Sequence, residues 1–372
     1  MNSFTFSCPC LFGLESVLSG EIKRLGGQNI ITTDGKVVFQ GDAAMLVRAN
    51  LWLRTAERVQ ILLGQFHAES FEELFQGVLS LPLEDFIGRT DAFPVKGWSL
   101  NSKLHSLPDC QAIIKKAVVE RLRKHYHVSW FEETGPVHQI QFSIRKDEVS
   151  ILLDTSGAGL HKRGYRANSN AAPIKETLAA GICDLAHVRS FSRVYDPFCG
   201  SGTLLIEAAL KAFQIAPGIR RGFAADKWGL IPDSLWADER KAAHAAILRN
   251  AEFTACGYDI DPEAVRLSQE NIRKAGVGSK IHVRQGDIRN FSIPEEHAIT
   301  LCNPPYGERM LEIKDAEKLY TAMGKVFPQQ EGRCYYIISP HENFEDFFGR
   351  PADKRRKLYN GMIKCQLFMY FK

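Results

Sequence analysis

The feature that most limits the fold of this chain is a regular alternation of strand and helix patterns that begins near residue 172. Short apolar runs separate longer segments with helical periodicity, and these runs cover residues 192–196, 254–259, 280–285, 298–302 and 333–339. Strands that alternate with helices in this way form parallel sheets with helices on both faces. The predicted fold class is therefore α/β, with a doubly wound, Rossmann-like sheet in the second half of the chain.

The end of the chain departs from this alternation. Two apolar segments, 355–359 and 362–371, flank Asn360-Gly361, which is a favoured pair for a two-residue type I′ turn. The last strand must then run antiparallel to its neighbour. A parallel sheet that ends in a hairpin is not the usual dehydrogenase arrangement, and it resembles the sheet of the methyltransferases that use S-adenosylmethionine (SAM).

Two smaller units of mixed helix and strand precede this sheet. The first contains an amphipathic helix and a hairpin about residues 34–35. The second contains a helix over 109–126, with Asp109 as its expected N-cap, and two alternating strands joined at 146–147. The polar, proline-terminated segment 167–173 is the expected joint to the last domain. We predict domains at 1–62, 63–166 and 167–372.

Positive charge is concentrated in the middle of the chain. The formal net charge is only +4, yet residues 96–124 hold seven Lys and Arg against two acids, and residues 157–175 hold four against none. Such a concentration predicts a surface for a polyanion. It also fits an ordinary solvated helix face, because Lys116, Glu120 and Lys124 stand at i,i+4 spacing. Charge alone leaves both interpretations open.

Several features that would indicate other functions are missing from the sequence. The nine cysteines do not show the spacing of zinc ligands, and the N-terminus does not resemble a signal peptide. No stretch approaches the roughly 18–20 apolar residues of a membrane span. We therefore expect no metal centre, no membrane contact and a reducing, cytoplasmic location.

Acidic residues end three successive predicted strands. A turn with Gly200 and Gly202 follows Asp196, and Asp259 and Asp287 end the next two strands. The carboxyl ends of parallel strands meet at one edge of the sheet, where open α/β sheets bind ligands. Glycines let the backbone approach a ligand, and a carboxylate can accept from both ribose hydroxyls. The turn lacks the third glycine of the dinucleotide motif and the lysine of a P-loop, so the pattern indicates a nucleotide-like ligand without identifying it.

The fourth predicted strand ends in the sequence Asn303-Pro-Pro-Tyr306. The two prolines fix the backbone and exclude a helix, so the turn holds the Asn303 amide oxygen and the Pro304 carbonyl oxygen in place. Two acceptors directed at one point suit an –NH₂ group, which donates two hydrogen bonds. Tyr306 offers a ring on which a planar base can stack, an interaction worth roughly 1–3 kcal/mol. We predict a site for the exocyclic amine of a nucleobase.

Taken together, these motifs resemble those of the amino-directed nucleic-acid methyltransferases. The residues that carry the resemblance are 196–203 (DPFCGSGT), 258–261 (YDID), 286–287 (GD) and 303–309 (NPPYGER). Residues 93–122 look like part of a THUMP RNA-binding domain, and residues 216–228 are similar to a segment of bacterial 23S rRNA guanine-N2 methyltransferases. The chain is identified as a member of the THUMP-containing class I SAM-dependent RNA methyltransferases, with a ferredoxin-like unit before the THUMP domain.

The resemblance implies direct methyl transfer from SAM to guanine N2 in structured RNA, with 23S rRNA as the expected substrate. It implies catalytic roles for Asn303, Pro304 and Tyr306. The residues expected to bind the cofactor are Asp196, Phe198, Gly200, Gly202, Thr203, Asp259, Ile260, Asp287, Ile288 and Asn303. We also expect Pro173 and Lys175 to close over the cofactor, and Glu308 and Arg309 to contact the substrate.

The basic segments are expected to bind RNA phosphates. The expected RNA-binding residues are Lys96, Lys103, Lys115, Lys116, Arg123, Lys162, Arg163 and Arg166. Three alternatives stay open: a guanine-N2 methyltransferase of tRNA, an adenine-N6 or cytosine-N4 methyltransferase of DNA, and a catalytically silent RNA-binding protein. The intact Asp196, Asp259, Asp287 and Asn303 argue against the silent protein, and the THUMP-like unit favours RNA over DNA.

Overall fold

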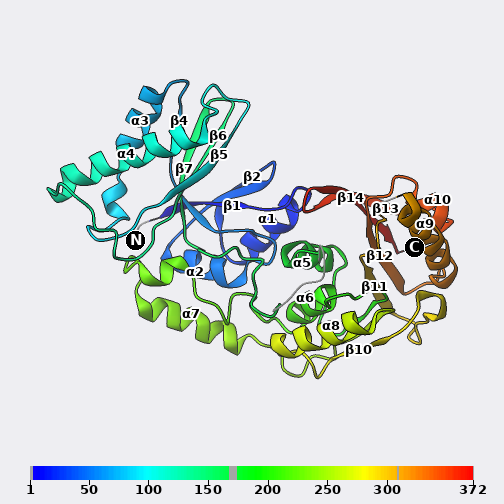
Figure 1. Cartoon of the computed structure of the whole chain (residues 1–372). Helices are drawn as coiled ribbons and strands as arrows, with labels where there is room; N and C mark the ends of the chain where they lie inside the picture. Colours follow the sequence, from blue (N-terminus) through cyan, green and yellow to red (C-terminus); the bar gives the residue numbers. More distant parts are fainter. Residues whose placement is uncertain (1–2, 167–173, 308–309, 372) are drawn as a thin grey trace.

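The computed structural model describes residues 3–166, 174–307 and 310–371, and this part of the chain forms two seven-stranded sheets (Figure 1). The strand order of the first sheet is β2-β3-β1-β4-β7-β6-β5, and that of the second is β10-β9-β8-β11-β12-β14-β13. The predicted α/β class is confirmed. None of the helices within the described ranges combines the length and the apolar character that crossing a membrane requires.

The first sheet joins both N-terminal units. Its strands are β1 (Phe4–Pro9), β2 (Gln28–Thr33), β3 (Lys36–Gly41), β4 (Gln60–His67), β5 (Val95–Leu100), β6 (Ile140–Arg145) and β7 (Glu148–Asp154). Strand β4 is not among the predicted strands, and it pairs antiparallel with β1 on one side and with β7 on the other. The boundary predicted at 62/63 falls inside this strand, so backbone hydrogen bonds of β4 connect the two units directly.

Four helices cover this sheet. They are α1 (Glu15–Arg24), α2 (Ala43–Trp52), α3 (Phe71–Leu79) and α4 (Leu107–Tyr126), and a short helix η1 (Leu83–Asp85) follows α3. Helix α4 begins after Ser106 rather than at the predicted cap Asp109, because Pro108 suits the first turn. Asp109 lies within that turn and accepts a hydrogen bond from the Ser106 hydroxyl at 2.6 Å.

The second sheet has the predicted parallel core with an antiparallel end. Its strands are β8 (Arg193–Asp196), β9 (Thr254–Asp259), β10 (Ile281–Gln285), β11 (Ala298–Cys302), β12 (Arg333–Ser339), β13 (Lys354–Asn360) and β14 (Ile363–Tyr370). Strand β14 runs antiparallel to β12, as expected. Figure 1 shows α5 (Glu176–Leu185), α6 (Thr203–Ala212) and α8 (Pro262–Ala275) on one side, and α9 (Met310–Val326) and α10 (Phe344–Phe348) on the other.

The terminal hairpin turns one residue later than predicted. Asn360 pairs with Ile363, so the two-residue loop is Gly361-Met362 and not Asn360-Gly361. Gly361 carries the positive φ of 64° that the turn needs. Asn360 stays in β13, where its side-chain amide donates to the Tyr306 hydroxyl at 3.2 Å. The last strand pair therefore contacts the loop that follows β11.

A segment of the second half packs with the first sheet. It contains η2 (Ala224–Lys227) and α7 (Asp233–Ala245), and α7 lies beside α2 (Figure 1). Phe223, Trp228 and Trp236 belong to the same buried core as the strands and helices of the first sheet. This segment follows the predicted joint in sequence, yet it ties the second half of the chain to the first.

Candidate active site

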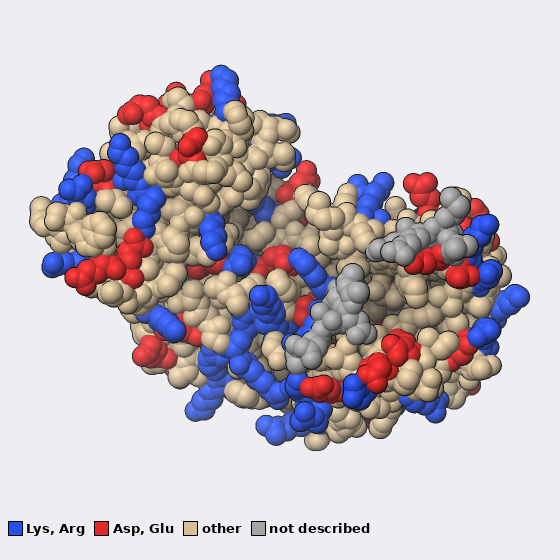
Figure 2. All heavy atoms as spheres, in the orientation of Figure 1, with Lys and Arg blue, Asp and Glu red and all other residues tan. Residues whose placement is uncertain are grey.

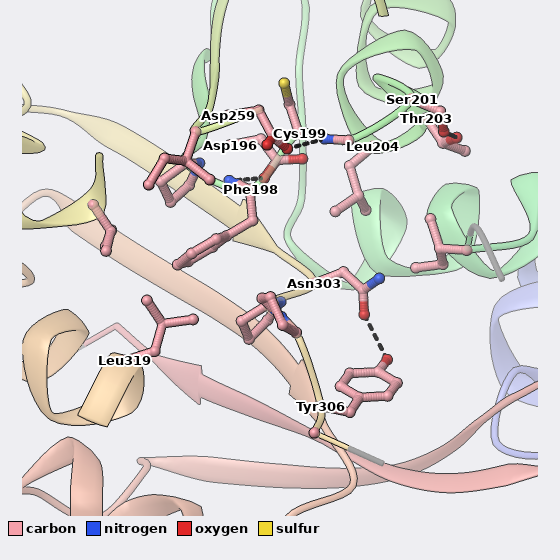
Figure 3. A pocket seen from close by; sticks show the side chains of 18 of the residues that line it. Asp196, Phe198, Cys199, Ser201, Thr203, Leu204, Asp259, Asn303, Tyr306 and Leu319 are labelled. Carbon is pink, nitrogen blue, oxygen red and sulfur yellow. Dashed lines mark hydrogen bonds between the residues drawn. The ribbon is translucent and has the colours of Figure 1, made fainter. Parts of the chain in front are cut away.

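A cavity of about 810 Å³ lies at the carboxyl edge of the second sheet. It is bounded by the ends of β8, β9, β10 and β11, the start of α6, the helix α9 and the terminal hairpin (Figure 3). The predicted site residues that line it are Asp196, Phe198, Gly200, Thr203, Asp259, Ile260, Asp287, Ile288, Asn303, Pro304 and Tyr306. The fold thus gathers residues from four strand ends around one space.

Asp196 lies buried at the end of β8. One of its carboxylate oxygens accepts the backbone N–H of Phe198 at 3.0 Å. Burial, reinforced by the nearby charge of Asp259, raises the pKa of Asp196 to about 8. Within the described residues, no Lys or Arg pairs with this carboxylate. A buried acid on a cavity wall without a protein cation suits a ligand that brings its own positive charge.

Asp259 connects the end of β9 with the glycine turn. Its carboxylate accepts the N–H of Gly200 at 2.9 Å and that of Asp261 at 3.0 Å. Gly200 has a φ of 49°, and a Cβ added there would meet open space, so the backbone at this turn is bare toward a ligand. These contacts place Asp259 and the turn against the same part of the cavity (Figure 3).

Gly202 does not line the cavity, although it is one of the predicted cofactor residues. It precedes α6 with a φ of 78°, and a Cβ there would lie 3.2 Å from the Cβ of Ser268 on α8. The second glycine of the turn therefore allows α6 and α8 to pack closely. Gly202 therefore acts on the cavity only through the packing of these two helices.

Asp287 has a partner that the sequence analysis did not anticipate. Its carboxylate accepts the backbone N–H of Arg289 at 2.9 Å at the start of the short helix η3 (Ile288–Asn290), and it also pairs with the Arg289 guanidinium. This hydrogen bonding lowers the pKa of Asp287 to about 2. A ligand amine that used Asp287 as an acceptor, as predicted for adenine, would have to share it with Arg289.

The Asn303–Tyr306 loop is held by hydrogen bonds on both sides. The Asn303 side-chain oxygen accepts the hydroxyl of Tyr306, as Figure 3 shows, and that hydroxyl also accepts from Asn360. The buried Tyr320 donates to the Pro305 carbonyl at 3.0 Å. The predicted amide acceptor is therefore occupied by Tyr306 in this structure, and the Tyr306 ring is half-buried rather than freely displayed.

Sequence reasoning missed the parts of the wall that come from distant elements. These are Leu204 on α6; Glu312, Asp315, Lys318, Leu319 and Ala322 on α9; and Asn360, Gly361 and Ile363 on the hairpin. No motif marks them, because their position depends on how α9 and the hairpin pack. Lys175 does line the cavity, and its ammonium lies 3.4 Å from the Glu57 carboxylate. Pro173, Glu308 and Arg309 lie outside the described residues.

The predicted RNA-binding residues occupy different environments. Lys96, Lys116 and Lys162 are exposed. Those that pair with carboxylates are Lys103 (with Glu69), Lys115 (with Glu133) and Arg123 (with Glu120).

Arg163 and Arg166 hold the joint between the two halves together. Arg163 is only 7% exposed, and its guanidinium donates to the carbonyls of Leu160 and Arg54. Arg166 donates to the Thr203 hydroxyl at 2.6 Å. A guanidinium buried in this way has no surface to offer a phosphate, so Arg163 is not part of the RNA surface that we propose below.

Comparisons with known proteins agree with this architecture. Family models match in three consecutive regions: the RlmL ferredoxin-like domain at 5–60, the THUMP domain at 68–154 and the RMKL-like methyltransferase domain (UPF0020) at 163–368. YpsC of Bacillus subtilis (strain 168), provisionally named an RNA methyltransferase, is 41% identical over all of this chain and 97% of its own length. The predicted ferredoxin-like and THUMP units are thereby confirmed.

Another relative is the ribosomal RNA large subunit methyltransferase K/L of Cellvibrio japonicus (strain Ueda107). It is 32% identical over the whole of this chain but over only 51% of its own length. The chain therefore spans about half the length of its K/L relatives.

Solved structures show the same fold over the entire chain. A possible methylase from Clostridium difficile 630 is 41% identical, with a TM-score of 0.96, and covers 100% of this chain and 98% of its own. SMU.472, provisionally named a methyltransferase and solved with S-adenosylhomocysteine, is 36% identical, with a TM-score of 0.95 and the same coverage.

The cavity residues fit S-adenosylmethionine. The buried, unpaired Asp196 suits a cationic group, the open space at Gly200 permits close approach, and Asp259 stands where a ribose acceptor is expected. Among the residues in 3–166, 174–307 and 310–371, no group of three or more His, Cys, Asp or Glu is placed to hold a metal ion. S-adenosylmethionine is the cofactor, and the chain belongs to the RMKL-like family of methyltransferases that carry an RlmL-type ferredoxin-like domain and a THUMP domain.

Proposed function

We propose that this protein methylates the exocyclic N2 amine of a guanine in RNA, with 23S rRNA as its substrate. The observation that carries the proposal is the placement of Asn303 and Pro304 on the wall of the cofactor cavity, just after β11, which pairs with the strand β8 that ends in Asp196. The THUMP domain and the names of the K/L relatives favour ribosomal RNA. A cytoplasmic location is part of this proposal, because ribosomal RNA is found there.

The chemistry follows from two acceptors and one ring. Bound S-adenosylmethionine supplies an activated methyl group on its sulfonium. Asn303 and the Pro304 carbonyl accept the two N–H bonds of the amine, which orients its lone pair and stabilises the positive charge that develops there. Positioning of this kind can contribute roughly 7–11 kcal/mol. Tyr306 stacks on the extruded base, so its hydroxyl must leave Asn303 when the substrate enters.

A methyl-transfer assay tests the proposal. The purified protein and a radiolabelled methyl donor are offered 23S rRNA, total tRNA and duplex DNA, and the products are digested to nucleosides. We expect the label in N2-methylguanosine from rRNA. The Asn303→Ala variant should lose at least about 100-fold in transfer rate, in the range found for removal of an oxyanion-hole donor, while its affinity for S-adenosylhomocysteine stays within about twofold. Label in another nucleoside, or an active Asn303→Ala variant, would refute the assignment.

A second candidate is an adenine-N6 methyltransferase of DNA. A solved structure named as a predicted N6-adenine-specific DNA methylase from Listeria monocytogenes str. 4b F2365 is 41% identical, with a TM-score of 0.94. Two acceptors and a stacking ring suit the adenine amine as well as the guanine amine, so the site itself does not separate the two. Label in N6-methyladenine of the DNA sample would favour this candidate, and label in tRNA would favour a tRNA substrate.

A further inference from the structure

Ion pairs neutralise much of the basic segment of the THUMP domain. Four of its cations pair with carboxylates of the same domain, and the pairs are Lys103–Glu69, Lys115–Glu133, Arg121–Glu84 and Arg123–Glu120. Figure 2 accordingly shows Lys and Arg mixed with Asp and Glu over this part of the surface. A surface with paired charges attracts a polyanion weakly, because little net field remains.

A second group of cations at the joint is not neutralised in this way. We call Lys162, Arg220 and Arg221 the joint patch. Arg221 donates to the carbonyls of Gly159 at 2.8 Å and Lys162 at 3.2 Å, and Arg220 donates to the carbonyl of Lys274 at 3.0 Å. In the described part of the chain, no carboxylate pairs with Lys162, Arg220 or Arg221. Carbonyl partners fix a guanidinium without cancelling its charge.

Other cations lie close to Arg221. Burial lowers the pKa of Arg221 to about 10, and repulsion from Arg163 and Arg58 adds to this effect. Figure 2 shows Lys and Arg side chains gathered in the middle of the visible face, between α7 and the grey segment. The segment that carries Arg220 and Arg221 is also held in place, because Arg240 donates to the carbonyls of Ile219 at 3.2 Å and Arg221 at 2.9 Å.

The joint patch is contiguous with the wall of the cofactor cavity. The N–H of Leu160, two residues before Lys162, donates to the Glu57 carbonyl at 2.8 Å. The Glu57 carboxylate in turn pairs with Lys175, which lines the cavity. This chain of contacts connects the segment that carries Lys162 with the cavity wall. A nucleic-acid strand bound on the patch is therefore close to the cavity.

We propose that the joint patch binds backbone phosphates of the RNA strand that leads to the target base. The inference rests on the proposed function and names where the flanking strand runs: across the joint between the two halves, not along α4. It replaces the expectation that Lys116 on α4 binds a phosphate. Arginine suits this task, because its planar fork can donate two hydrogen bonds to one phosphate. Carbonyl bonds that hold the guanidinium in advance reduce the ordering cost on binding.

Two matched double variants test the inference. Lys162→Gln/Arg220→Gln removes two charges from the joint patch, and Lys116→Gln/Lys124→Gln removes two from α4; all four side chains are exposed. The affinity of each protein for in vitro transcribed 23S rRNA is measured between 50 and 200 mM salt. The salt slope is the slope of log affinity against log salt concentration, and each phosphate contact that is lost reduces its size by about 0.7–0.9. We expect the joint variant to lower the slope by about 1.4–1.8 and to weaken binding at least about tenfold at 100 mM salt.

The α4 variant is the control, and its affinity for RNA should stay within about twofold of that of the unmodified protein. Both variants should have the same affinity for S-adenosylhomocysteine and the same melting temperature as the unmodified protein. An unchanged salt slope for the joint variant, a larger loss for the α4 variant, or an equal loss of cofactor binding would each overturn the inference. Failure of the proposed function is distinguishable, since it would appear as an unmodified protein that transfers no methyl group to RNA. If the unmodified protein methylates RNA and the joint variant is equally active, the proposed function stands and only the RNA-binding role of the joint patch is refuted.

Discussion

The environment at each strand end sets the pKa of the acidic side chain that lies there. Asp196 ends β8 in a buried position and faces the cofactor cavity, whereas Asp287 ends a turn beside Arg289. The same type of residue therefore has a pKa of about 8 in the first case and of about 2 in the second. Unlike Asp287, Asp196 pairs with no Lys or Arg in the described part of the chain, so it suits a cationic ligand group.

Replacement of Asp196 by Asn should stabilise the unliganded protein at high pH. The folded state holds the Asp196 proton up to a pKa of about 8, so ionisation costs stability progressively from about pH 4, the ordinary pKa of Asp, to about pH 8. Asn carries no such cost. We expect Asp196→Asn to raise the free energy of unfolding by about 1–4 kcal/mol at pH 8 and to have little effect near pH 4.

Calorimetric melting of both proteins between pH 4 and pH 9 checks this prediction. The same variant should bind S-adenosylmethionine at least about tenfold more weakly, because it loses a charge-assisted contact worth roughly 1.5–3 kcal/mol. Parallel melting curves across the whole pH range would contradict the assigned pKa.

Tyr306 has two separable parts, a ring and a hydroxyl. The proposed stacking needs only the ring, while the hydroxyl occupies the amide oxygen of Asn303 before substrate binds. We expect Tyr306→Phe to keep at least about a tenth of the transfer rate, and Tyr306→Ala to lose at least about 30-fold, as the roughly 1–3 kcal/mol of stacking per base allows. Steady-state rates on the same RNA decide the question, and equal losses in both variants would argue against stacking.

At the scale of elements, the terminal hairpin is part of the active site. It closes the sheet next to β12 and places Asn360 against the hydroxyl of Tyr306. Helix α9 supports the same loop from the other side, through the hydrogen bond from Tyr320 to the Pro305 carbonyl. Two elements that follow the motif in sequence thus hold the loop that we propose to bind the substrate amine.

Asn360→Ala should loosen this loop without affecting the cofactor. The variant loses one side-chain hydrogen bond, worth about 1 kcal/mol, and we expect a fall of about fivefold in transfer rate with an unchanged affinity for S-adenosylhomocysteine. Met362→Ala is the matched control, since Met362 is 97% exposed at the tip of the same hairpin. A control that loses as much activity as Asn360→Ala would indicate a general effect on the hairpin.

At the scale of the whole molecule, a buried ion pair lies where the two halves meet. The Arg163 guanidinium lies 3.6 Å from the carboxylate of Glu207 on α6, and Tyr165 donates to the same carboxylate at 2.9 Å. Arg163 also donates to a carbonyl of the first half, that of Arg54. Together with the core formed around Trp228 and Trp236, this network joins the RNA-binding half to the catalytic half.

Removal of one partner of this pair should be more harmful than removal of both. We expect Glu207→Leu to lower the free energy of unfolding by about 3–5 kcal/mol, because it leaves the Arg163 charge buried without a counterion. The double variant Glu207→Leu/Arg163→Leu should recover part of this loss. Denaturant unfolding of the three proteins measures the effect, and a double variant no more stable than the single one would exclude this account.

Local patterns were sufficient for the parallel strands of the second sheet and for the β6–β7 turn of the first. The apolar runs end at Asp196, Asp259 and Cys302, as the sequence predicts, and the turn at 146–147 has the positive φ values of a type I′ pair. Hydrophobic periodicity and turn-forming residues are local features of the sequence, so they predict elements without knowledge of the fold. Strand β4 was missed because its sequence lacks a clear alternation, and its pairing with β1 and β7 depends on residues far along the chain.

Local chemistry in the sequence predicts a cofactor edge and, after its fourth strand, a loop with acceptors for an amine, because strand ends, glycine turns and prolines act over only a few residues. Tertiary structure alone decided which charges are available. Arg163 is buried in a network, Asp287 is paired with Arg289, and four of the THUMP cations are paired with carboxylates. The guanidinium groups of Arg220 and Arg221 instead donate to backbone carbonyls. The sequence shows which residues are charged, but the packing of the fold determines which group each of them pairs with. That pairing determines whether the charge can still bind a ligand.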